Sequence, residues 1–289
     1  MCPQIFSLAI VCSLLPVAAL AGEQHAADKS GYSLFSPTPA AQMREFDTDR
    51  PDKTNSPHTL DAGHLQLEMD VFAFSHDAHN SDRSFVRNDS WTFTNANLRI
   101  GLTNWADLQL LVPFYQVSRD RDASTGSAMR QQGIGDFTVA LKMNLWGNDG
   151  GKTAGGLEIF IKAPTANHNL GNGKVEGGAV LLFDANLPGD FDLGINSGVS
   201  INANDSGSGH HAEIINSASV SHKVIGPLSA YAEFWSDVSA HPHAPVLATA
   251  DFGLLLMLGK NVQLDTGVNL GVTRAAPDVQ TFFGVSVRF

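Results

Sequence analysis

The sequence predicts an all-β fold, a single up-and-down antiparallel transmembrane β-barrel of about 12 strands. From Leu65 onward, apolar and polar residues alternate with the period of two that is typical of β-strands. Short turns rich in Gly, Pro, Asn and Asp alternate along the chain with longer polar links. The chain ends in an alternating segment whose last residue is the aromatic Phe289. Together these features favour a closed membrane barrel over a water-soluble β-sandwich.

The first expected strand, residues 65–71, shows the alternation clearly. It places four aliphatic side chains on one face and Glu68 and Asp70 on the other, whereas a helix would scatter them around its surface. Later segments repeat the pattern without a charged residue on the apolar face, although Asn216 and His222 interrupt one of these faces. The twelve expected strands span residues 65–71, 97–102, 107–114, 136–145, 157–162, 181–187, 191–202, 213–224, 228–238, 251–258, 262–272 and 280–289.

The connections between these strands are alternately short and long. The tight turns are expected at residues 103–106, 147–152, 188–190, 226–227 and 259–261, and the longer links at 76–83, 118–132, 164–177, 204–210, 240–246 and 274–278. Five short and six long connections fit twelve up-and-down strands with both ends on the short-turn side. In an outer membrane that side faces the periplasm.

The N-terminal residues have the features of an export signal. Residues 1–21 contain no charged side chain, include an apolar stretch from Ile5 to Leu20 and finish in the small-x-small sequence that ends at Ala21. We therefore expect a signal peptide at residues 1–21, an irregular arm at 22–59 and a barrel at 60–289. Cys2 and Cys12 both lie in the predicted signal, so the mature chain would contain no cysteine.

Composition excludes some classes of function. The net charge of −11 argues against nucleic acid as a partner. No catalytic, cofactor-binding or metal-binding motif is recognisable, because the glycine-rich turn 147–153 lacks the spacing of a phosphate-binding loop and the histidines at 210–211, 241 and 243 have no carboxylate or cysteine partners in sequence. The sequence thus indicates a protein that is not an enzyme and holds neither a cofactor nor a metal.

A resemblance to a known family rests on several motifs. Residues 48–57, which contain Arg50-Pro51-Asp52-Lys53, and residues 61–68 resemble the opening motif of the family described as putative MetA-pathway of phenol degradation. Further similar segments lie at residues 101–110, 135–147, 170–178 and 262–269, so the resemblance covers about residues 46–289. It implies an outer-membrane barrel of a Gram-negative bacterium, in contact with outer-membrane lipid, that transports small solutes and has a link to aromatic compounds. The terminal Phe289 would then be the signal read by the barrel-assembly machinery.

The polar faces of the expected strands would converge inside the barrel. The candidate pore-lining residues are Glu68, Asp70, Arg99, Asp136, Lys142, Glu158, Lys162, Asp184, Glu213, Lys223, Glu233, Asp237, Asp251, Asp265 and Arg288. Two interpretations remain open for them. They brace the barrel as salt bridges, or they line a hydrated path whose acidic excess favours cations and neutral polar solutes.

The expected arm is a candidate plug. Twelve strands enclose a narrow lumen, which loops or an N-terminal segment can close. Arg50, Asp52 and Lys53 are the residues that would contact the acidic wall, and a free periplasmic tail is the alternative. The leading hypothesis is therefore an outer-membrane channel for passive uptake of small, including aromatic, solutes. A structural or adhesive barrel and a secreted soluble β-barrel carrier are its rivals.

Overall fold

The computed structural model describes residues 28–78, 86–167, 170–204, 208–241 and 244–289. Within these residues the chain forms β-strands and one short 3-10 helix, η1 (Ala40–Gln42). No helix of the described residues is long and apolar enough to cross a membrane. The predicted signal peptide, with both cysteines, lies outside the described residues.

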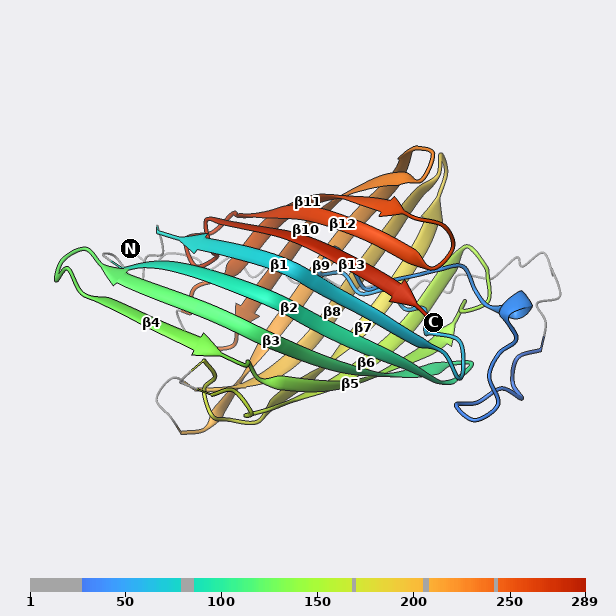
Figure 1. The fold of residues 1–289 in the computed structure, drawn as a ribbon, viewed down its shortest axis with the longest axis horizontal. Helices are drawn as coiled ribbons and strands as arrows, with labels where there is room; N and C mark the ends of the chain where they lie inside the picture. Colours follow the sequence, from blue (N-terminus) through green and yellow to red (C-terminus); the bar gives the residue numbers. More distant parts are fainter. Residues whose placement is uncertain (1–27, 79–85, 168–169, 205–207, 242–243) are drawn as a thin grey trace, which may run out of the picture.

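Twelve strands form a closed antiparallel barrel, which confirms the predicted fold class (Figure 1). Each of these strands pairs with the next one along the chain, except that β5 follows β3, and the ring closes where β1 pairs with β13. The strands are β1 (Leu65–Asp77), β2 (Val86–Thr103), β3 (Ala106–Asp122), β4 (Ala128–Gly133), β5 (Phe137–Trp146), β6 (Thr153–Ala163), β7 (Glu176–Leu187), β8 (Phe191–Ala203), β9 (His210–Ile225), β10 (Leu228–Ser239), β11 (Leu247–Met257), β12 (Val262–Gly271) and β13 (Val279–Arg288).

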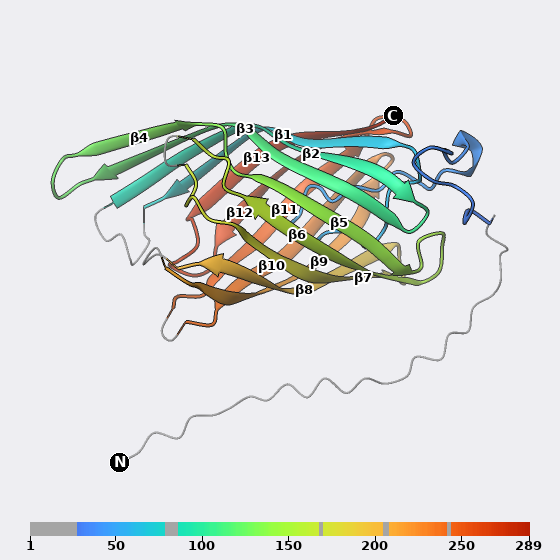
Figure 2. The ribbon, with the colours of Figure 1, turned by 90° about the horizontal axis from the view of Figure 1, so that it is seen from below.

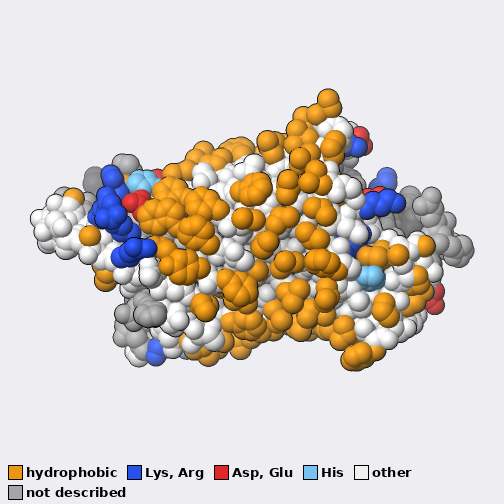
Figure 3. Space-filling view, viewed as in Figure 1, with side chains coloured by type: hydrophobic (Ala, Val, Ile, Leu, Met, Phe, Trp, Pro, Cys, Tyr) orange, Lys and Arg blue, Asp and Glu red, His pale blue; other side chains and the backbone are white. Residues whose placement is uncertain are grey.

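The barrel turns its apolar side chains outward and its charged side chains inward. Leu181 is 60% exposed and Phe234 is 52% exposed, whereas Arg99 and Lys142 are 1% and 0% exposed. Figure 3 shows the hydrophobic side chains spread over the outer surface of the strands. This arrangement is the reverse of a water-soluble protein and is the one that a barrel in lipid requires.

Three adjacent strands carry an unpaired residue at the same height, which reverses the alternation beyond it. Val71 in β1, Thr94 in β2 and Phe114 in β3 are skipped in the strand pairing. Because one extra residue exchanges the two faces of a strand, Phe72 and Phe93 lie on the lipid side beyond this row. This reversal explains why the strands expected from alternation at residues 65–71, 97–102 and 107–114 are shorter than β1, β2 and β3.

The expected long link at residues 118–132 is wrong in one respect. Here β3 continues to Asp122, and β4, a strand additional to the twelve of the barrel, pairs with it from Gln116↔Gly133 to Arg121↔Ala128. Polar side chains predominate on both faces of this hairpin, with Val117 and Met129 as the large apolar exceptions, so the sequence offers no regular alternation that would separate a strand from a loop. The hairpin extends β2 and β3 beyond the rest of the barrel (Figure 2).

The start of β1 and the end of β13 lie beside each other at the short-turn end of the barrel. The Phe289 amide donates a hydrogen bond to the Leu65 carbonyl at 2.8 Å, and the Phe289 carbonyl oxygen lies 3.1 Å from Nδ1 of His64. The arm that precedes β1 therefore starts at this end of the lumen.

Candidate functional site

The N-terminal arm, residues 28–59 in the described structure, enters the lumen from the short-turn end. η1 lies outside the mouth, and the residues that follow it run inside the ring of strands (Figures 1 and 2). The buried arm residues include Asp49, Thr54 and Ser56. Their polar side chains need partners within the protein, and the inward faces of the strands provide them.

A cluster of buried charges surrounds Asp49 at the centre of the lumen. The Lys142 ammonium of β5 contacts one Asp49 oxygen, and the Arg99 guanidinium of β2 lies 3.3 Å from the other. Gln109 Nε2 donates to the same carboxylate at 3.1 Å. Burial alone would raise the pKa of Asp49, but Arg99 and Lys142 hold it below its ordinary value. Asp49 is therefore a buried anion held by two cations of the wall.

Arg99 joins this arm residue to the wall itself. Its guanidinium lies 2.7 Å from Asp107, 3.1 Å from Glu68 and 3.3 Å from Asp49. It also donates to the backbone carbonyl of His58 in the arm at 2.9 Å. Removing a partner from such a buried network leaves charges with neither water nor counter-ion, so the network fixes the position of the arm.

Arg50 reaches the opposite wall of the lumen. Its guanidinium lies 2.6 Å from Asp265 of β12 and 2.7 Å from Asp70 of β1, and it stacks over the Phe282 ring at 5.6 Å from the ring centroid. Gly284 of β13 makes room for this side chain, because a Cβ atom at that position would collide with the guanidinium.

The next residues of the arm contact β9 to β11. The Lys53 ammonium lies 3.1 Å from Asp251, and the Lys53 amide donates to Glu233 at 3.0 Å. Thr54 donates to Ser217 at 2.8 Å, and Asn55 donates to Glu158 of β6 at 3.2 Å. The arm is thus bound on several sides of the lumen.

Asp52 is an arm carboxylate that forms no ion pair with the described residues. It accepts a hydrogen bond from Ser219 of β9, and burial, with smaller effects of Asp184 and Asp49, raises its pKa to about 7. Asp52 belongs to the arm and not to a spanning strand. Because its pKa is about 7, the charge of Asp52 changes near neutral pH, at the point where the arm crosses the lumen.

The mouth at the short-turn end holds the arm with a second set of charges. Asp149, in the turn between β5 and β6, lies 2.7 Å from Lys29 and 3.0 Å from Arg44. Although partial burial opposes it, hydrogen bonds from Lys29, Asn104 and Arg44 lower the pKa of Asp149 to about 2. Lys29 also lies 3.3 Å from Asp61.

The arm separates two cavities inside the barrel. One, of about 410 Å³, lies toward the short turns and is lined by the turn before β6, by β6 to β12 and by the arm. The other, of about 400 Å³, lies on the long-loop side and includes Asp70, Asn95 and Phe282. Both cavities share Arg50, Pro51 and Asp52, so these three residues form a wall between them.

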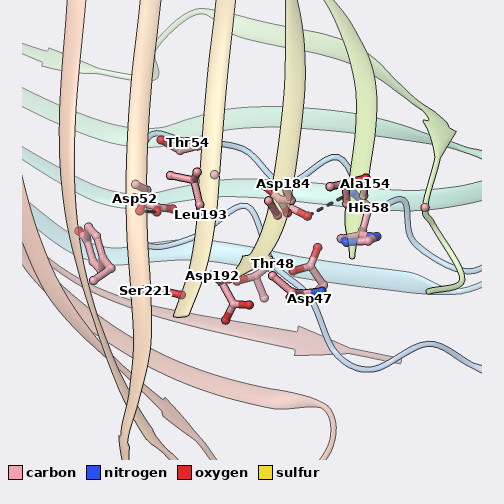
Figure 4. Close-up of a pocket in the computed structure, with 18 of the residues that line it drawn as sticks. Asp47, Thr48, Asp52, Thr54, His58, Ala154, Asp184, Asp192, Leu193 and Ser221 are labelled. Atoms are coloured by element: carbon pink, nitrogen blue, oxygen red, sulfur yellow. Dashed lines mark hydrogen bonds between the residues drawn. The ribbon is translucent and has the colours of Figure 1, made fainter. Parts of the chain in front are cut away.

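The cavity on the short-turn side is acidic. Asp47, Asp52, Asp184 and Asp192 line it together with Lys152, and Figure 4 shows the four carboxylates around the same space. Asp184 is half-buried and forms no ion pair with any described residue. A cavity of about 600 Å³ at the mouth continues from this region between the arm and the turn at Asp149.

The structure brings many of the predicted pore-lining residues together on the lumen wall. Those buried around the arm, or near its entry, are Glu68, Arg99, Lys142, Glu158, Glu233, Asp251, Asp265 and Arg288. Two smaller groups lie apart near the long loops. In one, Lys162 lies 3.1 Å from Asp136 and 2.6 Å from Glu176.

In the other group, Glu213 lies 3.0 Å from Nε2 of His211 and beside Asp237. Lys223 is exposed near the short turn between β9 and β10 and joins neither group. In the described part of the chain, no group of three or more His, Cys, Asp or Glu residues could hold a metal ion.

Sequence reasoning missed several residues of the central cluster. Asp49 lies next to Arg50 in the motif that carries the family resemblance, and Asp107 and Gln109 occupy the polar face of an expected strand. These three residues could therefore have been chosen as candidates from the sequence. What the sequence does not contain is the contact between the arm and β3, which joins positions 60 residues apart.

The apolar exterior, the closed ring of twelve strands and the charged lumen define a β-barrel of the outer-membrane type. The sequence model of the family described as putative MetA-pathway of phenol degradation matches residues 48–289. The chain therefore belongs to that family, and the resemblance drawn from its motifs is confirmed. Comparison with curated protein sequences gives no match.

Solved structures share the fold. The barrel is similar to the COG4313 outer membrane channel from Pseudomonas putida F1, with a TM-score of 0.57 and 12% identity, over 84% of this chain and 100% of that one. It is also similar to the beta domain of the Bordetella autotransporter BrkA, with a TM-score of 0.51 and 10% identity, over 78% of this chain and 99% of that one. At these identities the likeness establishes the barrel fold alone.

Proposed function

We propose that the protein is a passive outer-membrane channel for small solutes, and that its N-terminal arm is a plug. One observation carries the proposal: the cavities on the two sides of the lumen share Arg50, Pro51 and Asp52 as a common wall. A barrel that served only as a scaffold would need no such cavities. Solutes would cross by diffusion, with polar groups of the lumen replacing part of their hydration.

The charge of the cavities suggests the class of solute. The short-turn cavity is lined by four carboxylates and by Arg50 and Lys152, which favours cationic and neutral polar solutes over anions. Phe46 and Tyr231 line the same cavity, and Phe282 lines the other, so aromatic compounds find flat apolar contacts beside polar groups. We therefore include small aromatic compounds among the proposed solutes.

The proposed route to the membrane uses both ends of the chain. Cleavage after Ala21 would release the arm on the periplasmic side, where its described part enters the mouth of the barrel. Phe289 is 68% exposed after the last residue of β13, a position in which the assembly machinery could read it. In this orientation the long loops and the β3–β4 hairpin face the outside of the cell.

Deletion of residues 22–59 tests both parts of the proposal. The single-channel conductance of the variant in planar bilayers should exceed that of the full mature chain several-fold, because the shared wall is removed. A gel that separates folded from heat-denatured barrel confirms that the variant still folds. Equal conductance of a folded variant would contradict the plug.

Liposome swelling with the deletion variant then tests transport itself. Sugars, amino acids and aromatic amines and acids of similar size should enter at different rates, with cationic and neutral compounds entering faster than anions. If every compound were excluded from liposomes that hold folded, arm-free barrel, the protein would be a structural or adhesive barrel instead.

A further inference from the structure

Four arginines lie together on the outer face of the barrel near the long loops. Arg87, Arg119, Arg121 and Arg130 are all exposed, and we call them the arginine cluster. Arg87 lies directly opposite Arg121 in the β2–β3 pairing, and Arg119 lies opposite Arg130 in the β3–β4 pairing. Like charges directly opposite each other on neighbouring strands are destabilising, so a bound negative charge would stabilise the cluster.

The described residues supply little negative charge to this cluster. Asp89 is opposite Arg119, but its carboxylate lies 2.6 Å from Nδ1 of His76. Asp120 accepts a hydrogen bond from Asn88 at 2.6 Å, and Asp122 accepts one from Ser124 at the hairpin turn. Within the described part of the chain, none of the four arginines forms an ion pair with a carboxylate.

An apolar groove lies directly beside the cluster on the same face. It has a volume of about 680 Å³ and is lined by Trp91, Phe93, Tyr115, Val117 and Met129, with Arg119 and Arg130 at its end. Phe93 belongs to a row of rings across β1 to β3, since its centroid lies 5.4 Å from that of Phe72 and 6.1 Å from that of Tyr115. In Figure 3 the basic side chains gather next to this hydrophobic area, at the ends of β2 to β4.

We propose that this surface binds one molecule of lipid A, the phosphorylated and multiply acylated glycolipid of the outer leaflet. The arginine cluster would hold a phosphate, because the guanidinium fork matches phosphate oxygens and the charges are complementary. An acyl chain would occupy the aromatic groove. The proposal rests on the orientation proposed above, in which the long loops face outward.

The geometry favours a lipid over free phosphate or a protein partner. The groove continues into the apolar outer surface of the strands, so an acyl chain reaches it without leaving the membrane. A row of aromatic residues with a basic rim above it matches the boundary between acyl chains and headgroups. Inorganic phosphate would use the arginines but leave the groove empty.

Native mass spectrometry of the full mature chain in detergent tests the proposal. Bisphosphorylated lipid A is added to wild type and to the variant Arg87→Gln/Arg119→Gln/Arg121→Gln/Arg130→Gln. The matched control is Lys174→Gln/Arg274→Gln, which removes exposed cations from other links near the long-loop end. We expect one retained lipid on wild type and control, and at least about tenfold weaker binding by the four-arginine variant.

Two further measurements separate the contribution of the phosphate from that of the acyl chain. Dephosphorylated lipid A should bind wild type as weakly as bisphosphorylated lipid A binds the four-arginine variant, and Tyr115→Ala should weaken binding of lipid A without affecting binding of inorganic phosphate. Equal binding by wild type and the four-arginine variant would overturn the proposal, as would full competition by inorganic phosphate. Channel conductance, measured in parallel, should be unchanged in the four-arginine variant, so this test stands apart from that of the channel.

Discussion

The guanidinium of Arg50 lies 2.6 Å from the carboxylate of Asp265, although the two residues are 215 positions apart in the chain. This pair fixes the arm against β12, on the side of the lumen opposite to β5 and β6. On the other side, Asp49 is held by Lys142 and Arg99. Adjacent arm residues of opposite charge thus reach opposite parts of the wall, which holds the arm across the lumen.

Gly284→Ala should loosen the arm without changing the arm itself. The added methyl group would collide with the Arg50 guanidinium and displace it from Asp265. We expect a rise in single-channel conductance or in the frequency of open events. Gly31→Ala is the control, because a Cβ atom there meets open space. If the two alanine variants conducted alike, the Arg50 contact would not hold the channel closed.

Arg99→Met should lower the stability of the barrel strongly. The variant leaves Asp107, Glu68 and Asp49 without their shared cation, and loss of one partner from a buried ion pair typically costs about 3–5 kcal/mol. The free energy of unfolding in urea, measured in detergent or lipid, checks this. Lys223→Met, at an exposed position, should change it by less than about 0.5 kcal/mol. Similar values for both variants would contradict the proposed importance of the central cluster.

The pH of the solution should affect the position of the arm through Asp52. Burial raises the pKa of Asp52 to about 7 in the docked arm, from the ordinary value of 3.8 in a free one. The docked state therefore retains its proton between pH 3.8 and about 7, whereas the free arm loses it, so docking weakens as the pH rises through this range. Conductance should increase from pH 5 to about pH 7 and then level off.

Asp52→Asn tests the origin of this pH dependence. The carboxyl groups of Asp184 and Glu233 also lie near Asp52, so the variant should reduce the slope of conductance against pH rather than abolish it. It should also keep the arm docked at pH 8, because the amide carries no charge. A profile that superimposes on that of wild type would rule out Asp52 as the titrating group.

Asp149→Asn should release the start of the arm at the mouth. The carboxylate holds Lys29 and Arg44, and these contacts lower its pKa to about 2. Their stabilising effect is fully present above pH 3.8 and is lost as the pH falls through about 2, so at neutral pH the variant lacks it entirely. Trypsin should cleave after Lys29 and Arg44 faster in the variant than in wild type. Equal cleavage rates would show that the remaining contacts at the mouth suffice.

Ion selectivity should depend on the acids of the short-turn cavity. Asp47 and Asp52 leave with the arm, so Asp184→Asn/Asp192→Asn removes the two carboxylates of this cavity that the barrel wall itself supplies, without breaking an ion pair. The reversal potential in a salt gradient, measured on the arm-free barrel, should move toward that of a less cation-selective channel. Asp136→Asn, whose carboxylate pairs with Lys162 nearer the long loops, should have a smaller effect. A larger effect of Asp136→Asn would place the selective region elsewhere.

The sequence alone determined the barrel, because alternation is a local property. Within each strand, such as β8 (Phe191–Ala203), the alternation of apolar and polar residues shows which side chains face lipid and which face the lumen. The number of strands in the ring follows from this alternation, as does the inward orientation of Glu68, Lys142 and Asp265. Alternation fails at Phe114, because a single unpaired residue exchanges the two faces of β3 and nothing in the composition announces it.

Only the tertiary structure decided where the arm lies and which charges pair. Arg50, Asp52 and Lys53 could be chosen from the sequence as contacts for an acidic wall, but an irregular segment has no periodicity from which its partners could be read. The pairing of Arg50 with Asp265, or of Lys142 with Asp49, depends on which strands face each other across the lumen. Closure of the ring sets those distances, and the energy of a buried charge then selects the one arrangement that leaves few charges unpaired.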